Sequence, residues 1–257
     1  MSAKIQWVAL QTIVDKEVTR IFRIWGQTIL PPVITMSLYF IIFGGFLGSQ
    51  IGDISGFRYV EFITPGLIMM AVITNSFMNV VSSFFSSKFQ KNIEEILVSP
   101  TSVSVLIIGY VAGGMARGLT VGVLLLCVSL LFAKLQVHNL GIILAFVVLS
   151  SMVFALAGLM NGIFAKKFDD VSIVPTFILW PLTYLGGVFY SIRLLPYFWQ
   201  HLSMLNPIVY MVNGFRYGFL GISDSSVWFG LAMLSVLAVA LFLANWALLK
   251  KGVGIKN

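Results

Sequence analysis

Long apolar segments, separated by short charged or broken stretches, make up most of the sequence. The hydrocarbon core of a bilayer is about 30 Å thick, and roughly 20 mostly apolar helical residues cross it with their backbone hydrogen bonds satisfied internally. Six segments reach that length. They run approximately Trp25–Leu47, Phe62–Ser86, Val105–Phe132, Leu140–Ala165, Ile173–Ile192 and Val227–Leu249. The pattern predicts an all-α integral membrane protein with six transmembrane helices.

The first two dozen residues have a different pattern. Six apolar residues recur there at spacings of three and four: Trp7, Leu10, Val14, Val18, Ile21 and Trp25. Four polar residues fall on the opposite side: Thr12, Lys16, Arg20 and Arg23. This periodicity is typical of an amphipathic helix. Residues 1–24 are therefore predicted to lie on the cytoplasmic membrane surface, with the apolar stripe in the lipid and the cations toward anionic headgroups.

The loop between the second and third spans, about residues 87–100, predicts a short helix that Pro100 ends. Its apolar face comprises Phe89, Ile93, Ile96 and Leu97. Lys88, Lys91, Glu94 and Glu95 flank that face. The helix suits a groove on a partner protein, and a connector whose apolar face rests on the membrane fits equally well.

The stretch before the sixth span, about residues 195–221, is apolar but interrupted. Pro196, Asn206, Pro207 and Gly214 break it into pieces too short to span a bilayer. We therefore expect a re-entrant helical hairpin, in which two short helices dip into the outer leaflet and return. Non-helical backbone at that depth must be covered by protein or line a wet cavity.

The distribution of Lys and Arg predicts the orientation, because cytoplasmic loops carry an excess of both. One predicted side holds Lys4, Lys16, Arg20, Arg23, Lys88, Lys91, Lys166, Lys167, Lys250, Lys251 and Lys256. The other holds Arg58, Lys134, Arg193 and Arg216. Both termini are therefore expected in the cytoplasm.

Composition agrees with a membrane protein, at 59% hydrophobic and 10% charged residues. The net charge of +7 does not indicate nucleic-acid binding, because the basic residues flank apolar spans instead of forming one solvated face. The lone Cys127 and the separated His138 and His201 suggest no metal site. The sequence contains no G-x-x-x-x-G-K-[ST] phosphate loop, so any ATP must be bound by another subunit.

Three polar residues within spans are candidates for function. Arg117 lies near the middle of the third span, where a cation costs about 2.5–3.5 kcal/mol unless it faces a polar interior. Asn75 and Asn79 belong to a polar stripe on the second span. Each could line a transport path or serve only structural hydrogen bonding. Gly114, Gly118 and Gly122 of the third span predict close packing of another helix.

No Asp or Glu falls clearly inside a predicted span. Proton relays in membranes usually need such carboxylates, so a proton-driven transporter is disfavoured. The energy source is expected outside this chain, which is not predicted to be an enzyme.

Three segments carry a resemblance to a known family. They are F-I-T-P-G-L-I-M-M at Phe62–Met70, N-I-E-E-I-L-V-S-P at Asn92–Pro100 and L-N-P-I-V-Y-M-V-N-G-F-R-Y-G-F-L-G at Leu205–Gly221. With the amphipathic entry helix and the spans, they resemble the permease subunit of ABC-2-type exporters, especially the small bacterial YadH-type permeases. The similarity covers nearly the whole chain, and no single motif in it is catalytic.

The resemblance implies a permease of the bacterial inner membrane that forms a homodimer and binds two separate ABC ATPase subunits. ATP and Mg²⁺ belong to those partners, and this chain is implied to hold no cofactor or metal. Residues 1–24 would be the gate or connecting helix, and residues 25–257 the six-helix transmembrane domain in contact with membrane lipids.

The resemblance also suggests roles for particular residues. The ATPase-coupling helix would present Phe89, Lys91, Ile93, Glu94, Glu95 and Leu97. The translocation path between two copies would be faced by Asn75, Asn79 and Tyr184, with Arg117 as a further candidate. The outer re-entrant segment would be built on Pro196, Asn206, Pro207, Gly214 and Arg216.

Two other classes of function remain open from the sequence. One is a carrier or channel that works without an ATPase. The other is a membrane assembly or scaffold subunit without transport, which would tolerate changes at Asn75 and Asn79.

Overall fold

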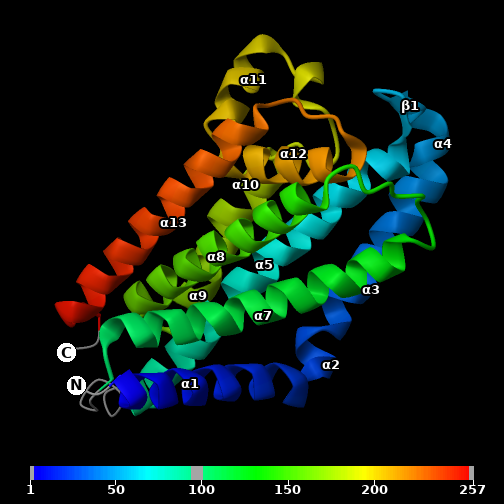
Figure 1. Ribbon diagram of the computed structural model, residues 1–257. Coiled ribbons are helices and arrows are strands. Elements are labelled where there is room, and N and C mark those ends of the chain that lie inside the picture. Colours follow the sequence, from blue (N-terminus) through cyan, green and yellow to red (C-terminus); the bar gives the residue numbers. More distant parts are fainter. Residues whose placement is uncertain (1–2, 94–100, 255–257) are drawn as a thin grey trace.

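The computed structural model describes residues 3–93 and 101–254 and is a bundle of long helices (Figure 1). Within these residues, five helical segments are long and apolar enough to cross a membrane. They are Trp25–Leu47, α5 (Tyr59–Phe89), α7 (Val103–Ser129), α8 (Leu140–Phe164) and α13 (Val227–Lys250). The first of them comprises α2 (Trp25–Thr28), α3 (Leu30–Tyr39) and the π-helix η1 (Phe40–Leu47). Each coincides with a predicted span.

Shorter elements connect the long helices. Near the start lie α1 (Ala3–Arg23), α4 (Gly48–Ile51) and the antiparallel pair β1 (Asp53–Ile54) and β2 (Phe57–Arg58), in which Asp53 pairs with Arg58. Between α8 and α13 lie α9 (Phe168–Val174), the π-helix η2 (Pro175–Leu179), α10 (Trp180–Tyr184), the 3₁₀ turn η3 (Ile192–Leu194), α11 (Tyr197–Met204) and α12 (Pro207–Leu220).

The centre of the bundle is α5, which packs mainly against α8, α7 and α12. In its most apolar 18-residue stretch, 83% of the residues are buried, against 17% in the corresponding stretches of Trp25–Leu47 and α13. The latter two therefore present most of their surface outward. The hydrophobic core is formed around α5.

Glycines allow the neighbouring helices to approach α5 closely. A Cβ on Gly118 of α7 would lie 3.0 Å from the carbonyl oxygen of Val72 on α5. A Cβ on Gly158 of α8 would lie 2.5 Å from the carbonyl oxygen of Phe77. These distances leave no room for larger residues, so the glycine stripe predicted to serve packing has that role.

Polar side chains fix where three of the helices begin, by accepting a hydrogen bond from a free N–H of the first turn. Ser102 Oγ accepts from Val105 N at 3.3 Å at the start of α7. Asn139 Oδ1 accepts from Ile142 N at 3.1 Å at the start of α8. Asn206 does the same for α12, which begins with Pro207.

The predicted helix over Ile173–Ile192 differs from the structure at both ends. Helical residues run without interruption from Phe168 to Tyr184, through α9, η2 and α10. The chain then turns at Gly187, whose φ of +70° is in the left-handed region that favours glycine. The helix therefore ends before Ile192, and this segment is not among the five long apolar helices.

Both ends of the chain lie at the same end of the bundle (Figure 1). The ends of α5 and α8 meet there as well, because Lys88 Nζ donates hydrogen bonds of 2.7 Å to the carbonyl oxygens of Ile163 and Ala165. Arg193 lies at the opposite end, where it pairs with Asp224 at 3.3 Å. Lys88 and Arg193, one from each predicted group of basic residues, thus lie at opposite ends of the bundle.

We predict that Gly158→Ala lowers the stability of the protein, because its Cβ would collide with the carbonyl of Phe77. Overpacking of this kind costs about 1–3 kcal/mol. The measurement is the thermal unfolding midpoint of the protein purified in detergent. Gly45→Ala is the control, since no atom lies within 4 Å of its added Cβ. Equal midpoints for the two variants would contradict the packing account.

Candidate functional site

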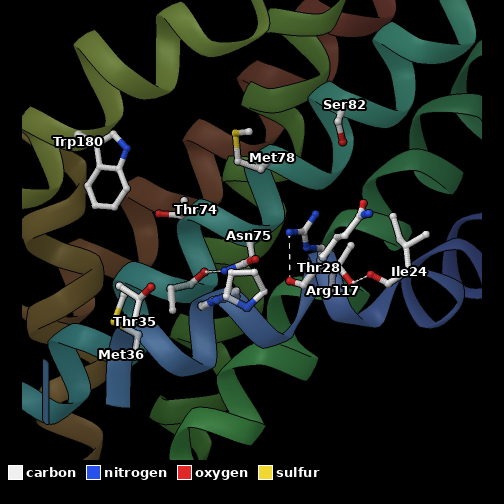
Figure 2. A pocket seen from close by; sticks show the side chains of 14 residues that line it. Ile24, Thr28, Thr35, Met36, Thr74, Asn75, Met78, Ser82, Arg117 and Trp180 are labelled. Carbon is white, nitrogen blue, oxygen red and sulfur yellow. Dashed lines mark hydrogen bonds between the residues drawn. The ribbon is translucent and has the colours of Figure 1, made fainter. Parts of the chain in front are cut away.

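A cavity of about 480 Å³ opens among α2, α3, α5, α7 and α10 (Figure 2). Apolar side chains such as Met36 and Met78 form much of its wall. Hydroxyl and amide groups of Thr28, Thr74 and Asn75 also face it. It lies within the size range of small-molecule sites and combines an apolar wall with a few polar groups.

Two of the four proposed path residues line this cavity. Asn75 and Arg117 both do, although they come from different helices. Figure 2 shows Arg117 next to Thr28, whose carbonyl oxygen accepts a hydrogen bond of 3.2 Å from Arg117 Nη2. The structure therefore brings the intramembrane cation and part of the polar stripe together.

The other two path candidates lie elsewhere. Asn79 is buried on the side of α5 that faces α1, where its Oδ1 accepts from Arg20 Nη2 at 2.9 Å. Tyr184 is 45% exposed and stacks on Phe189 with 6.0 Å between ring centroids. Neither is among the lining residues of the cavity.

The N-terminal helix α1 is attached to α5 through a buried carboxylate that the sequence pattern did not reveal. Glu17 is fully buried, and its Oε1 accepts a hydrogen bond of 2.6 Å from Ser83 Oγ. Its Oε2 pairs with Arg20 Nη2 at 3.1 Å. We call Glu17, Arg20, Asn79 and Ser83 the α1 lock. It joins the amphipathic helix to the same helix that carries Asn75.

The α1 lock corrects one expectation. Arg20 was expected on a polar face directed toward anionic headgroups, but it faces α5 and donates to Asn79. The available signal was a second pair of glycines on α7. A Cβ on Gly109 would lie 2.5 Å from Ile13, and one on Gly113 would lie 2.5 Å from Glu17. Ile13 and Glu17 are four residues apart on α1, as Gly109 and Gly113 are on α7. The helix α1 therefore fits along this groove of α7.

The loop after α5 is only partly described. Phe89 ends α5 with 60% of its surface exposed, and Lys91 follows in a turn with a φ of +62°. Ile93 is fully buried within the chain, so Phe89, and not Ile93, offers an apolar side chain to a partner. Glu94, Glu95 and Leu97 lie outside the described residues.

The last turn of α5, directly before this loop, is connected to three other helices. Ser87 Oγ accepts from Tyr110 of α7 at 3.1 Å and from Lys16 of α1 at 3.4 Å. Lys88 reaches the last carbonyls of α8, as described above. The end of α5, from which the loop leaves, is therefore linked to α1, α7 and α8 by direct contacts.

At the opposite end, α11 and α12 form the helix pair expected from Pro196 and Asn206–Pro207. Pro196 precedes α11, and Asn206 Nδ2 donates to the Leu182 carbonyl oxygen at 2.6 Å. Gly214 faces the ring of Phe146 so closely that a Cβ would overlap it. The pair is thereby held against α10 and α8.

Arg216 of α12 is the largest fully buried side chain among the described residues. Its Nε donates to the Phe62 carbonyl oxygen at 3.1 Å and its Nη2 to that of Gly187 at 2.7 Å. The guanidinium also lies over the Phe62 ring, 3.9 Å from the centroid. This cation therefore joins α12 to α5 and to the turn after α10.

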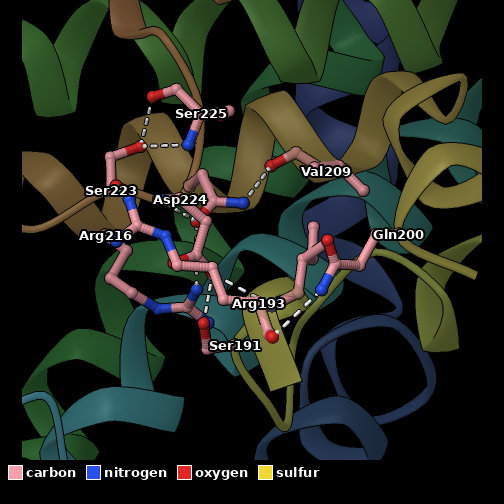
Figure 3. Close-up of polar contacts among 10 residues, drawn as sticks. Ser191, Arg193, Gln200, Val209, Arg216, Ser223, Asp224 and Ser225 are labelled. Carbon is pink, nitrogen blue, oxygen red and sulfur yellow. Dashed lines mark hydrogen bonds and ion pairs between the residues drawn. The ribbon is translucent and has the colours of Figure 1, made fainter. Parts of the chain in front are cut away.

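Asp224 forms a second polar cluster beside Arg216 (Figure 3). Its Oδ2 accepts hydrogen bonds from Ser191 Oγ at 2.8 Å and from Ile192 N at 3.0 Å. Its Oδ1 pairs with the exposed Arg193. The carboxylate thereby holds part of the segment between α10 and α11.

Comparison with known proteins identifies relatives over most of the chain. Residues 8–220 match the family model of the ABC-2 type transporter. The chain is 59% identical over 251 residues to the inner membrane transport permease YadH of Escherichia coli strain K12, covering 98% of both chains. It is 22% identical over 215 residues to nodulation protein J of Rhizobium meliloti strain 1021, covering 83% of this chain and 82% of the relative.

We predict that Glu17→Ala releases α1 from the bundle, because Ser83 and Arg20 lose their buried acceptor. Removing one partner of a buried ion pair costs about 3–5 kcal/mol. Trypsin should then cleave the purified protein faster after Arg20 or Arg23, as followed by mass spectrometry. Asp15→Ala, an exposed carboxylate on the same helix, is the matched control. Identical cleavage rates in both variants would show that Glu17 does not hold α1.

We further predict that Arg216→Met strongly destabilises the protein, since the carbonyls of Phe62 and Gly187 lose their donors. Each buried group left unpaired costs about 1–3 kcal/mol. Arg193→Met should change stability by about 0–1 kcal/mol, because that side chain is 73% exposed. Thermal unfolding in detergent measures both, and a similar shift for the two variants would contradict the role of Arg216.

Proposed function

The chain belongs to the ABC-2 type transporter family, and we propose that it is the transmembrane permease subunit of an ATP-driven exporter in the bacterial inner membrane. The printed name of the relative from Escherichia coli supports both the transport role and the membrane. The ATPase is a separate subunit that binds ATP and Mg²⁺. This chain provides the substrate path and is not itself an enzyme.

The proposed topology has six crossings with both termini in the cytoplasm. The helical segment Phe168–Tyr184 supplies the fifth crossing, in addition to the five long apolar helices. The gathering of the N-terminus, Lys88 and the C-terminus at one end supports this orientation under the positive-inside rule. The pair α11 and α12 would then be the re-entrant hairpin of the outer leaflet.

The proposed substrate path lies between two copies of the chain. Apolar residues of α3 and η2, including Ile34, Leu38 and Phe177, are exposed beside the cavity. A second copy on this face would cover them and enclose the cavity, with Asn75 and Arg117 inside. Tyr184, on the same exposed side, would meet the partner copy at the edge of the path.

The contact between α1 and the last turns of α5, directly before the loop, is the observation that carries the coupling proposal. Ser87 joins the last turn of α5 to Lys16 and Tyr110, and Ser83 joins α5 to Glu17 a single helical turn earlier. A force on the loop would therefore be transmitted to α1 and to the helix that lines the cavity. ATP binding draws the two ATPases together and moves this loop, and hydrolysis resets it.

We predict that Glu94→Arg with Glu95→Arg abolishes binding of the ATPase subunit without unfolding the permease. Reversing both charges on the proposed coupling helix would juxtapose like charges across the contact. The measurement is a pull-down of the tagged protein from its native membrane in mild detergent, with co-purifying chains identified by mass spectrometry. The wild type should retain a stoichiometric P-loop ATPase.

Lys166→Glu with Lys167→Glu is the control, since it reverses two charges at the same end of the bundle. Retention of the ATPase by the Glu94 and Glu95 variant would refute the coupling role of this loop. An isolated wild-type permease, even after crosslinking, would instead support an ATP-independent carrier.

A further inference from the structure

The cavity described above contains a single charged side chain. Among the described residues that line it, Arg117 is the only Lys, Arg, Asp or Glu. The other polar groups are hydroxyls, amides and the indole of Trp180, and the rest of the wall is apolar. A ligand in this cavity would therefore experience one uncompensated positive charge.

Several neutral donors of the cavity are occupied by the protein backbone. Thr74 Oγ donates to the Met70 carbonyl at 2.9 Å, and Asn75 Nδ2 donates to the Ala71 carbonyl at 2.9 Å. Thr28 Oγ likewise donates to the carbonyl of Ile21 at 3.0 Å. The guanidinium of Arg117 is the charged donor among the described lining residues.

Arg117 uses only part of its capacity. Its Nη2 donates to Thr28, whereas its Nε is buried and has no hydrogen-bond partner in the described part of the chain. The Nε of Arg20 is also buried without a hydrogen-bond partner among the described residues, but the charge of Arg20 is paired with Glu17. A buried donor without a partner costs free energy, and an unpaired cation within a span costs more. The arrangement becomes favourable when an anion binds.

We propose that this cavity is a substrate subsite for a phosphate-bearing amphiphile, whose phosphate oxygens bind the guanidinium of Arg117. The planar guanidinium matches phosphate oxygens in paired hydrogen bonds. The volume of about 480 Å³ accommodates a headgroup and not merely a single ion. This inference rests on the proposed function, because it assigns the cargo class of the permease.

The surroundings of the cavity fit the apolar body of such a ligand. Ile34 and Leu38 of α3 are exposed on either side of the lining residues Thr35 and Met36. Phe177, which is 74% exposed, precedes the lining residue Trp180 in the same helical segment. An alkyl chain could lie along this face while the phosphate stays at Arg117.

The test is a binding titration of the full-length permease purified in dodecyl maltoside. Dodecyl phosphate is the probe, and its dissociation constant is measured by microscale thermophoresis. Arg117→Gln should weaken binding about tenfold or more, because it removes charge-assisted hydrogen bonds. Arg117→Lys should weaken it less, since the charge remains. Arg193→Gln, which removes an equal charge outside the cavity, should leave binding unchanged.

A second variant protects the test against a failure of Arg117→Gln to fold. Thr35→Trp adds bulk at an exposed position of the cavity wall and leaves Arg117 in place. It should also abolish binding of dodecyl phosphate. Equal binding by the wild type, Arg117→Gln and Thr35→Trp would overturn the proposal.

Two further probes distinguish the source of the phosphate. Inorganic phosphate should bind at least tenfold more weakly than dodecyl phosphate, and dodecyltrimethylammonium should show no dependence on Arg117. If inorganic phosphate bound as tightly as dodecyl phosphate and depended on Arg117, the proposal of an amphiphilic substrate would be overturned. A water-soluble phosphate ligand would then be indicated. The pull-down of the ATPase does not depend on these titrations. If the wild type retained no ATPase but bound dodecyl phosphate through Arg117, the ATP-driven exporter would be refuted and the subsite would stand.

Discussion

The burial of α5 is the constraint on which the rest of the structure depends. A helix surrounded by other helices must present small or complementary surfaces on every side, because the interior tolerates neither voids nor overlap. Here the neighbours supply the small residues: Gly118 on α7 and Gly158 on α8 place their backbones against α5. The approach of α7 places Asn75 and Arg117 at one cavity, and Gly113 of α7 leaves room for Glu17, which accepts from Ser83. Both polar sites are consequences of this packing.

Three buried or half-buried arginines show three ways of accommodating a cation in the bundle. Arg20 is neutralised by Glu17 and also donates to Asn79. Arg216 is satisfied by backbone carbonyls and the Phe62 ring, which fix it between three segments. Arg117 has one carbonyl partner and faces a cavity. In the first two arrangements the charge is paired with a carboxylate or surrounded by backbone carbonyls, which is a structural role, whereas Arg117 has no acidic partner among the described residues that line the cavity.

The sequence predicted the spans well because their position depends on composition alone; Trp25–Leu47 has the same bounds in the structure. It did not predict that the helix after α8 ends at Tyr184, because apolar residues continue to Ile192 and composition does not reveal the turn at Gly187. The burial of Glu17 was missed for a similar reason. A helix pattern identifies an apolar face but does not say whether lipid or another helix covers the other face. Only the tertiary packing reveals that α7 receives α1.

The two helical segments beside the cavity, Trp25–Leu47 and Phe168–Tyr184, are built differently from the core. Each contains a π-helical stretch, η1 in the first and η2 in the segment Phe168–Tyr184. Such turns often occur at functional sites, and the first span is only 17% buried in its most apolar stretch. Segments with few buried contacts rearrange at lower cost than a packed core. In the proposed coupling, a movement of the loop after α5 displaces α1 through Glu17. The two helical segments beside the cavity take up this displacement, and α5, α7 and α8 keep their packing. The cavity at Arg117 lies on that boundary, so it is where a conformational change would alter the volume offered to a ligand.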